Sequence, residues 1–254
     1  MTALVTGATV GIGREFAEQL GAKGVPLVLV ARDSARLESV AAELRSAHGV
    51  AVEVLTADLS DREALERVAE RLRDPSRPVD VLVNNAGYSL NSRFVDSDVR
   101  AEEQLLDVLV RAVLVLSHAA ATTMQARGHG RIINVSSVAG YLASGTYSAA
   151  KSYVTTFTES LAGELVGTGV SVTALLPGYV RTEFHDRAGI DKGERTGPFW
   201  LDAADVVRAA LADAESGTIV SVPSRQYKAI ATLVRHAPRA LVRSRRVRSL
   251  HRKD

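Results

Sequence analysis

Cysteine is absent from this sequence of 254 residues. Its absence excludes disulfide bonds, thiolate nucleophiles and cysteine metal sites, and it leaves the redox environment open. Long apolar runs are missing too, since none reaches the roughly 18 residues that a membrane-spanning helix needs. The first residues, Met-Thr-Ala-Leu-Val-Thr-Gly, also lack the basic and apolar regions of a signal peptide. We therefore expect a cytoplasmic protein without a membrane span.

Aromatic residues are scarce, at 5%, but apolar residues as a whole make up 46% of the chain and charged residues 24%. These fractions are ordinary for a soluble globular protein and exclude disorder as the main state. A chain of this length suits a single α/β domain with one core. No internal repeat or low-complexity stretch divides the sequence, and we therefore expect one main domain.

The net charge of +2 hides an uneven distribution of charge. Residues 225–254 carry ten Lys and Arg against one acidic residue, whereas the rest of the chain carries 21 Lys and Arg against 28 Asp and Glu. The basic character therefore belongs to the tail, and it gives no reason to expect that the body binds nucleic acid. We expect a globular domain over residues 1–222 and a basic helical tail over residues 223–254.

Apolar segments typical of buried strands alternate along the chain with segments of helical periodicity. The predicted strands cover residues 3–6, 27–30, 50–55, 79–83, 131–135, 170–176 and 218–222. The predicted helices cover residues 11–23, 34–48, 61–73, 99–126, 146–166 and 203–214. Residues 181–200 are polar and predict an irregular loop or lid. This order indicates an α/β protein with a Rossmann-like, doubly wound, parallel seven-stranded sheet and helices on both faces.

A glycine-rich turn joins the first strand to the first helix, with the sequence Thr-Gly-Ala-Thr-Val-Gly-Ile-Gly at residues 6–13. Gly7 suits a tight turn, Gly11 would let a pyrophosphate approach the backbone, and Gly13 would let the helix pack on the strand. The helix N-terminus offers free N–H groups to phosphates. The alternative is a glycine-rich turn that binds no ligand.

The spacing of these glycines resembles that of the short-chain dehydrogenase/reductase family, which carries Thr-Gly-x-x-x-Gly-x-Gly at this place. Three further motifs agree: Asn-Asn-Ala-Gly at residues 84–87, Tyr-x-x-x-Lys at residues 147–151 and Pro-Gly at residues 177–178. The resemblance implies an oxidoreductase whose domain over residues 1–222 is dinucleotide-binding and catalytic. It implies Ser137, Tyr147 and Lys151 as catalytic residues. It implies that the cofactor is bound by Gly7, Thr9, Gly11, Ile12, Gly13, Arg32, Asp58, Leu59, Asn85, Ala86, Gly87, Tyr147, Lys151, Pro177, Gly178, Val180 and Thr182.

The end of the second strand determines which dinucleotide is expected. An acidic residue there would bind the ribose 2′-hydroxyl of NAD, but the sequence has Ala31 followed by Arg32. A guanidinium matches a 2′-phosphate in charge and geometry, so Arg32 predicts NADP(H). The alternative is that Arg32 is a solvated surface residue and that Asp33 binds the ribose. Some family members carry a second basic residue before the middle glycine, where this chain has Val10.

The resemblance implies particular contacts for three of these positions. Asp58 would contact the adenine amino group with Leu59 beside the ring, and Thr182 would contact the nicotinamide carboxamide. Asp58 could also cap the helix that follows it, and both roles can hold.

The spacing of Tyr147 and Lys151 puts a phenol and an ammonium on one face of a helix. At about 5 Å and an effective dielectric constant of about 20, the ammonium would lower the tyrosine pKa by roughly two units from about 10. The pair would then exchange a proton with a carbonyl or alcohol. Ser137 would hydrogen-bond the substrate oxygen, with the neighbouring Ser136 as the alternative. Ten residues separate Ser137 from Tyr147, fewer than the thirteen common in the family.

One position departs from the family pattern. An asparagine in the long helix usually holds a water that links the lysine to solvent, and alignment places Leu109 there. None of the four asparagines of the chain can take this role by sequence position. We expect an active enzyme with a rearranged proton relay, and a catalytically weak NADP-binding regulatory protein as the alternative.

The substrate and the partners are predicted only by class. Phe184, Phe199 and Trp200 in the lid favour a hydrophobic carbonyl or alcohol substrate, unless they merely pack the lid. His185 has no metal-ligand partner by spacing, so no metal is expected. The tail predicts a helix that caps the domain with a solvated basic face, or else a basic amphipathic helix that lies on an anionic membrane or a partner. The family resemblance further implies a homodimer or homotetramer, with no nucleic-acid partner.

Overall fold

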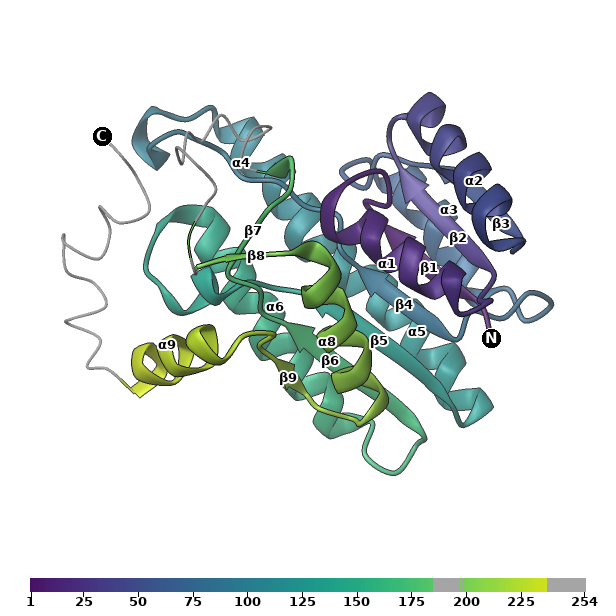
Figure 1. Cartoon of the computed structure of the whole chain (residues 1–254). Coiled ribbons are helices and arrows are strands. Elements are labelled where there is room, and N and C mark those ends of the chain that lie inside the picture. The colour runs from purple at the N-terminus through teal and green to yellow at the C-terminus, as the bar shows by residue number, and fades with distance from the viewer. Residues whose placement is uncertain (185–196, 198, 237–254) are drawn as a thin grey trace.

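The computed structural model describes residues 1–184, 197 and 199–236. Seven strands form one parallel sheet in the order β3-β2-β1-β4-β5-β6-β9 (Figure 1). The strands are β1 (Ala3–Thr6), β2 (Leu27–Ala31), β3 (Val52–Thr56), β4 (Val81–Asn84), β5 (Gly130–Val135), β6 (Val170–Leu175) and β9 (Val220–Ser221). The order reverses beside β1, where β4 continues the sheet in the other direction. This arrangement confirms the predicted doubly wound, Rossmann-like fold.

Helices cover both faces of the sheet, because successive side chains of each strand point to opposite faces. Ala3 and Val5 of β1 join one apolar cluster, whereas Leu4 joins the other. The first cluster is covered by α1 (Gly11–Ala22), α2 (Ser34–His48) and α8 (Ala203–Glu215). The second is covered by α3 (Arg62–Arg73), α5 (Ala112–Arg127) and α6 (Gly145–Glu164). Strands buried on both faces explain why the sequence shows continuous apolar runs.

The long helix predicted over residues 99–126 is interrupted. It consists of α4 (Val99–Leu106), a π-helical segment η2 (Asp107–Arg111) and α5. Arg111 bonds Asp107 at 2.8 Å and donates to the Ser60 carbonyl at 2.6 Å, so the segment is tied to the chain before α3. By length and composition the stretch Val99–Arg127 could cross a membrane, but half of its most apolar window is buried inside the protein. We interpret it as a core helix.

Several short elements border the carboxyl ends of the strands and were not predicted. They are the 3-10 turns η1 (Phe94–Asp96) and η3 (Val138–Tyr141), and the paired strands β7 (Tyr179–Val180) and β8 (Trp200–Leu201). The strands β7 and β8 flank the loop predicted over residues 181–200, and only Trp200 of β8 falls within it. Residues 185–196 and 198 of this range lie outside the described residues. Strand ends also differ by one to two residues from the prediction, for example at β3 and β4, because only the hydrogen-bonded ladder decides where pairing begins.

The tail begins with the amphipathic helix α9 (Arg225–His236), which packs against the domain. The Tyr227 ring lies directly over Gly178, where a side chain would collide with it. The Tyr227 hydroxyl donates to the Phe199 carbonyl at 2.8 Å and accepts from the Tyr179 backbone at 3.0 Å. The first half of the tail is therefore part of the wall around the strand ends. The rest of the predicted tail, residues 237–254, lies outside the described residues.

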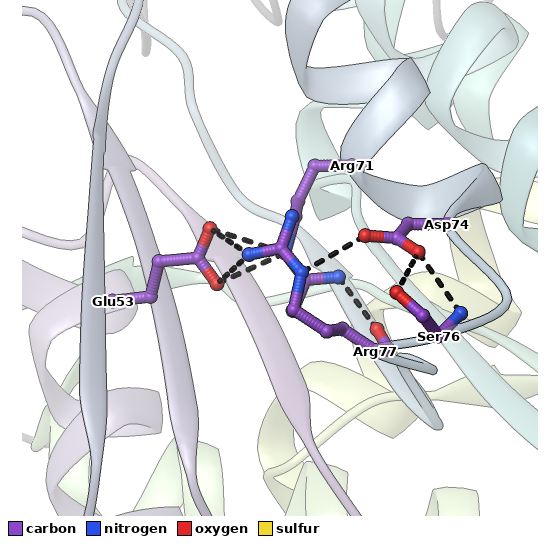
Figure 2. A network of polar contacts seen from close by, with 5 residues as sticks. All are labelled: Glu53, Arg71, Asp74, Ser76 and Arg77. Atoms are coloured by element: carbon purple, nitrogen blue, oxygen red, sulfur yellow. Dashed lines mark hydrogen bonds and ion pairs between the residues drawn. The ribbon is translucent and has the colours of Figure 1, made fainter.

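A charged network ties the end of α3 to the edge strand β3 (Figure 2). The buried Arg71 donates through Nε to both oxygens of Glu53, at 2.9 and 3.1 Å, and through a terminal nitrogen to the Arg77 carbonyl. Arg77 in turn reaches Glu53 and Asp74. Hydrogen bonds from Ser76 and Arg77 lower the pKa of Asp74 to about 2. The network fixes the turn that leads from α3 into β4.

Candidate active site

A cavity of about 1010 Å³ opens at the carboxyl ends of the central strands. Parallel α/β sheets bind ligands at this edge, next to the point where the strand order reverses. With the exception of Gly13, every residue predicted to be catalytic or to bind the cofactor lines this cavity. The tertiary structure therefore brings together positions that are up to 175 residues apart in the chain, from Gly7 to Thr182.

The glycine-rich turn forms one end of the cavity. Gly7 and Gly11 have φ values of 66° and 56°, in the left-handed region that glycine adopts without strain. A Cβ at Gly7 would lie 2.9 Å from the Ala86 Cα, and one at Gly11 would lie 3.0 Å from the Thr182 side chain. Gly13 lies beneath the turn, where a Cβ would collide with the Gly7 carbonyl. The turn therefore leaves the backbone of α1 accessible from the cavity at Gly11.

The helix α1 begins without a side-chain cap at Val10. Its first N–H groups are therefore available to a ligand in the cavity, where Gly11 and Ile12 form the lining. The free N–H groups of this helix N-terminus lie beside Gly11, whose backbone a ligand can approach closely. This combination suits the phosphates of a nucleotide.

Arg32 lies at the end of β2, is exposed and lines the cavity. It forms no ion pair with any residue that the structure describes. The alternative ribose ligand, Asp33, is engaged elsewhere, because it caps α2 by accepting the Arg36 N–H at 3.0 Å. The geometry thus favours Arg32 over Asp33 as the residue that faces a nucleotide.

Sequence analysis missed a second cation, Arg36, which lines the same end of the cavity. Arg36 also forms an ion pair with Glu183 at 2.8 Å. Its position four residues after Arg32, in the first turn of a helix, was the available signal.

Asp58 lines the cavity, but one of its oxygens closes a turn. It accepts hydrogen bonds from the backbone and the hydroxyl of Ser60 at 2.9 and 2.7 Å. The suggestion that Asp58 caps the following helix is wrong, since Asp61 caps α3 by accepting the Ala64 N–H. The second oxygen of Asp58 takes no part in these two bonds.

The Asn-Asn-Ala-Gly turn is tied firmly to β1. The Thr6 hydroxyl accepts from the backbone of Asn85 and Ala86, and the Asn85 amide donates to the Thr6 carbonyl. Asn84 points inward instead and donates to Asn134 at 2.9 Å. The turn therefore presents rigid backbone to the cavity between the glycine-rich turn and the helix α6.

Ser137, Tyr147 and Lys151 meet on the opposite side of the cavity. Lys151 donates through Nζ to the Val135 carbonyl at 2.6 Å, and its Nζ lies 5.8 Å from the centre of the Tyr147 ring. The Ser137 hydroxyl donates to the Pro177 carbonyl at 3.5 Å and lies close enough to Tyr147 to lower the pKa of its phenol. Ser136 is turned away, because its hydroxyl bonds the Lys151 carbonyl and Thr155. Of the two serines, Ser137 is the one placed beside the tyrosine.

The electrostatics of this group differ from the expectation. Burial raises the pKa of Tyr147 to about 12, and the neighbouring Ser137 hydroxyl lowers it only in part. Burial also lowers the pKa of Lys151 to about 8. The predicted lowering of the tyrosine pKa by the lysine is therefore wrong for the protein without ligands. The reason is that removal from water disfavours both charged forms, and this cost exceeds their mutual attraction.

Leu109 occupies the place expected for a polar relay residue. It lies fully buried in the π-helical segment η2 and packs in an apolar cluster with Leu105 and Ala150. A Cβ at Gly87 would lie 2.8 Å from Leu109 Cδ2 and 3.8 Å from Lys151 Nζ. The surface beside the ammonium on this side is therefore apolar.

The remaining wall of the cavity is rich in apolar side chains. Phe184 packs on Tyr147 with ring centres 5.9 Å apart, and Phe199 and Tyr141 also line the cavity. Trp200 does not line the cavity, because its ring packs on Tyr179. The prediction that Trp200 contributes to the substrate pocket is therefore wrong. Sequence analysis also missed Ile230 and Val234 of α9, because it treated the tail as separate from the site.

No group of three or more His, Asp or Glu side chains that could hold a metal ion occurs within residues 1–184 and 197–236 as far as these are described. His185 lies outside the described residues. The chemistry available at the cavity is thus that of a phenol, a hydroxyl and an ammonium beside a nucleotide-sized space.

This chain is similar in sequence and fold to known proteins. The family model described as short chain dehydrogenase matches residues 1–193. An uncharacterized oxidoreductase of Staphylococcus saprophyticus is 36% identical over 212 residues, covering 82% of this chain and 88% of the relative. A short-chain dehydrogenase from Sphingobium yanoikuyae, solved in complex with NADPH, is 37% identical with a TM-score of 0.86 over 94% of each chain. A bulky-bulky ketone specific alcohol dehydrogenase from Comamonas testosteroni is 30% identical with a TM-score of 0.79, over 94% of this chain and 95% of that one.

Proposed function

The chain belongs to the short-chain dehydrogenase family, and on this premise we propose that it transfers a hydride between NADP(H) and a hydrophobic carbonyl or alcohol substrate. The observation that carries the proposal is the meeting of Ser137, Tyr147 and Lys151 at one cavity with the glycine-rich turn. A proton-transfer group and a phosphate-binding turn at one site are what a nicotinamide-dependent oxidoreductase requires.

The residues around the cavity fit a nicotinamide dinucleotide. The uncapped N-terminus of α1 and the close approach allowed by Gly11 suit the pyrophosphate. The Lys151 ammonium donates one hydrogen bond to the Val135 carbonyl, and its other N–H groups remain for the hydroxyl groups of a ribose. Asp58 and Leu59 would hold the adenine, and Thr182 with the backbone of residues 177–180 would hold the nicotinamide.

We propose NADP(H) rather than NAD(H) because Arg32 offers an unpaired guanidinium where the adenosine ribose would lie, with Arg36 beside it. The NADPH complex of the Sphingobium yanoikuyae enzyme supports this choice. Fluorescence titration should show tighter binding of NADPH than of NADH. Arg32→Ser should weaken NADPH binding about 10- to 100-fold and leave NADH binding unchanged.

Arg67→Ser, at an exposed position of α3 outside the cavity lining, is the matched control for the loss of one positive charge. Equal affinities of the wild-type protein for the two cofactors would rule out the assignment of Arg32 to a 2′-phosphate.

When bound, the nicotinamide would supply or accept the hydride. Tyr147 would donate a proton to the substrate oxygen during reduction and take it back during oxidation. Since burial raises its pKa to about 12, Tyr147 is protonated at neutral pH, which suits the donor role in carbonyl reduction. Ser137 would hold the same oxygen by a hydrogen bond, and Lys151 would hold the ribose and add positive charge near the phenol.

Tyr147→Phe tests the proposal, since it removes one oxygen and keeps the ring that packs on Phe184. We expect a loss of at least about 100-fold in kcat for NADPH-dependent ketone reduction with NADPH affinity retained. A screen of bulky apolar ketones is the starting point, since the Comamonas testosteroni relative is specific for bulky-bulky ketones. Unchanged turnover by Tyr147→Phe would overturn the role of this residue.

A second function, that of a catalytically weak NADP-binding regulatory protein, is favoured by Leu109, because an apolar neighbour of Lys151 cannot relay a proton. Our leading proposal is an active enzyme in which backbone carbonyls and water replace the relay. Leu109→Asn distinguishes the two. If the wild-type protein binds NADPH but reduces no carbonyl while Leu109→Asn gains activity, the regulatory function is correct.

A further inference from the structure

Large apolar side chains are exposed around the open side of the cavity. Phe94, Phe199 and Ile230 line the cavity yet remain exposed, with 64% of Phe94 and 51% of Phe199 accessible to solvent. Val95 and Leu233 extend this set on η1 and α9, with exposed fractions of 74% and 72%. We call these five residues the mouth surface. Single exposed apolar residues are common, but a set that surrounds one opening indicates a contact surface.

The helix α9 adds positive charge beside the mouth surface. Its exposed Arg225, Lys228 and Arg235 face no acidic residue within the helix, and Arg235 lies 3.9 Å from Glu159 of α6. Near Val95, the charges of Arg93 and Asp96 pair with each other at 3.5 Å. The sequence after α9 carries seven Lys and Arg against one Asp and lies outside the described residues. Within the described residues, the exposed face of α9 beside the mouth surface is positively charged.

Three kinds of occupant could cover such a surface, and the combination of features distinguishes them. A nucleic acid or another soluble polyanion would use the basic residues but not the exposed Leu233 and Val95. A second copy of the chain would use the apolar residues, but it would bring the basic faces of two α9 helices together. An anionic bilayer uses both, because apolar side chains enter the acyl region while Lys and Arg meet the headgroups.

We propose that the mouth surface, together with the basic face of α9, docks on an anionic phospholipid membrane. In Figure 1, α4, the β7–β8 pair and α9 lie at the same end of the molecule, away from α2 and α3. Docking at this end would turn the cavity toward the bilayer. The proposal is independent of the enzymatic activity, since docking requires neither cofactor nor substrate.

The experiment is co-sedimentation of the full-length protein with vesicles of phosphatidylcholine, and of phosphatidylcholine mixed with phosphatidylglycerol. We expect binding to the mixed vesicles only, weakened by salt. Lys228→Gln should lower the partition coefficient about fivefold, since one Lys near such a surface contributes about 1 kcal/mol.

Leu233→Asp tests the apolar component, because Leu233 does not line the cavity and its change leaves the site residues intact. The partition coefficient should fall at least about tenfold. Val166→Asp is the matched control. Val166 is 80% exposed and lies between α6 and β6, at the amino-terminal edge of the sheet, opposite the cavity. Circular dichroism of both variants verifies that they are folded.

Three outcomes would overturn the proposal. The first is no binding to the mixed vesicles. The second is binding that Leu233→Asp and Val166→Asp affect equally, which would identify a general polyanion surface. The third is self-association of the wild-type protein that Leu233→Asp abolishes in light scattering without vesicles, which would identify a second copy as the occupant.

Discussion

Lys151 carries an ammonium group in a wall of the cavity where only 5% of its surface is exposed. Its pKa falls to about 8 because burial disfavours the charged form. The amine donates to the Val135 carbonyl at 2.6 Å and lies 5.8 Å from the centre of the Tyr147 ring. The site therefore stores an unfavourable desolvation free energy that a bound nucleotide can offset through hydrogen bonds.

This burial predicts how stability depends on pH. Between pH 8 and the ordinary lysine value near 10.5, the unfolded chain binds the Lys151 proton while the folded protein has lost it. The free energy of unfolding attributable to Lys151 therefore rises with pH in this window. We therefore expect the free energy of unfolding of the wild-type protein, measured by urea denaturation relative to Lys151→Met, to rise by about 2 kcal/mol between pH 7 and 9.5.

Lys23→Met, which removes a half-exposed lysine that pairs with Glu215, controls for the loss of a surface charge. Parallel stability curves for wild type and Lys151→Met over this pH range would contradict the assigned burial of the ammonium.

At the scale of elements, the junction of α3 with the edge strand β3 depends on one partly buried ion pair (Figure 2). The Arg71 side chain is only 7% exposed, so its guanidinium needs the Glu53 carboxylate that it contacts through Nε. Glu53→Gln would leave the arginine charge without its partner. We expect a loss of about 1–3 kcal/mol in the free energy of unfolding.

The comparison variant is Glu66→Gln, which breaks an exposed pair with Arg73. Its effect in the same urea titration should stay within about 0.5 kcal/mol. Equal effects of the two variants would show that the Glu53 network adds no more than a surface ion pair.

Elements also show where sequence patterns stop being informative. Helix α3 could be predicted, because its helical periodicity is a local signal. Its cap was not predicted correctly, since Asp61 caps the helix and Asp58 does not. The π-helical segment at residues 107–111 could not, because Leu109 and its neighbours have ordinary helical spacing. The segment packs against α6, and Arg111 donates to the Ser60 carbonyl, and both of these contacts are tertiary.

For the whole molecule, the exposed apolar residues outside the mouth surface support the homo-oligomer implied by the family resemblance. Leu106, Leu114 and Tyr153 are exposed on α4, α5 and α6. The Tyr153 ring also stacks on Phe157, with centres 5.7 Å apart. We therefore expect a homodimer or homotetramer that pairs through these helices.

Light scattering coupled to size exclusion should give a mass of at least two chains, and Leu114→Asp should shift the protein toward the monomer. Val166→Asp adds the same charge at the far end of α6 and should leave the mass unchanged. A monomeric wild-type protein would refute the oligomer.

The sequence by itself determined the fold class, the alternation of strands with helices along the chain, and the motifs. The reason is that apolar periodicity, glycine spacing and helix caps are local properties. It also singled out Arg32, Ser137, Tyr147 and Lys151, which the fold then gathers around one cavity. Only the tertiary structure decided that Ser136 turns into α6, that Arg36 lies beside Arg32, and that α9 forms a wall of the cavity. It also reversed the expected pKa of Tyr147. The reason is that exposure and desolvation depend on neighbours distant in the chain, which no local pattern specifies.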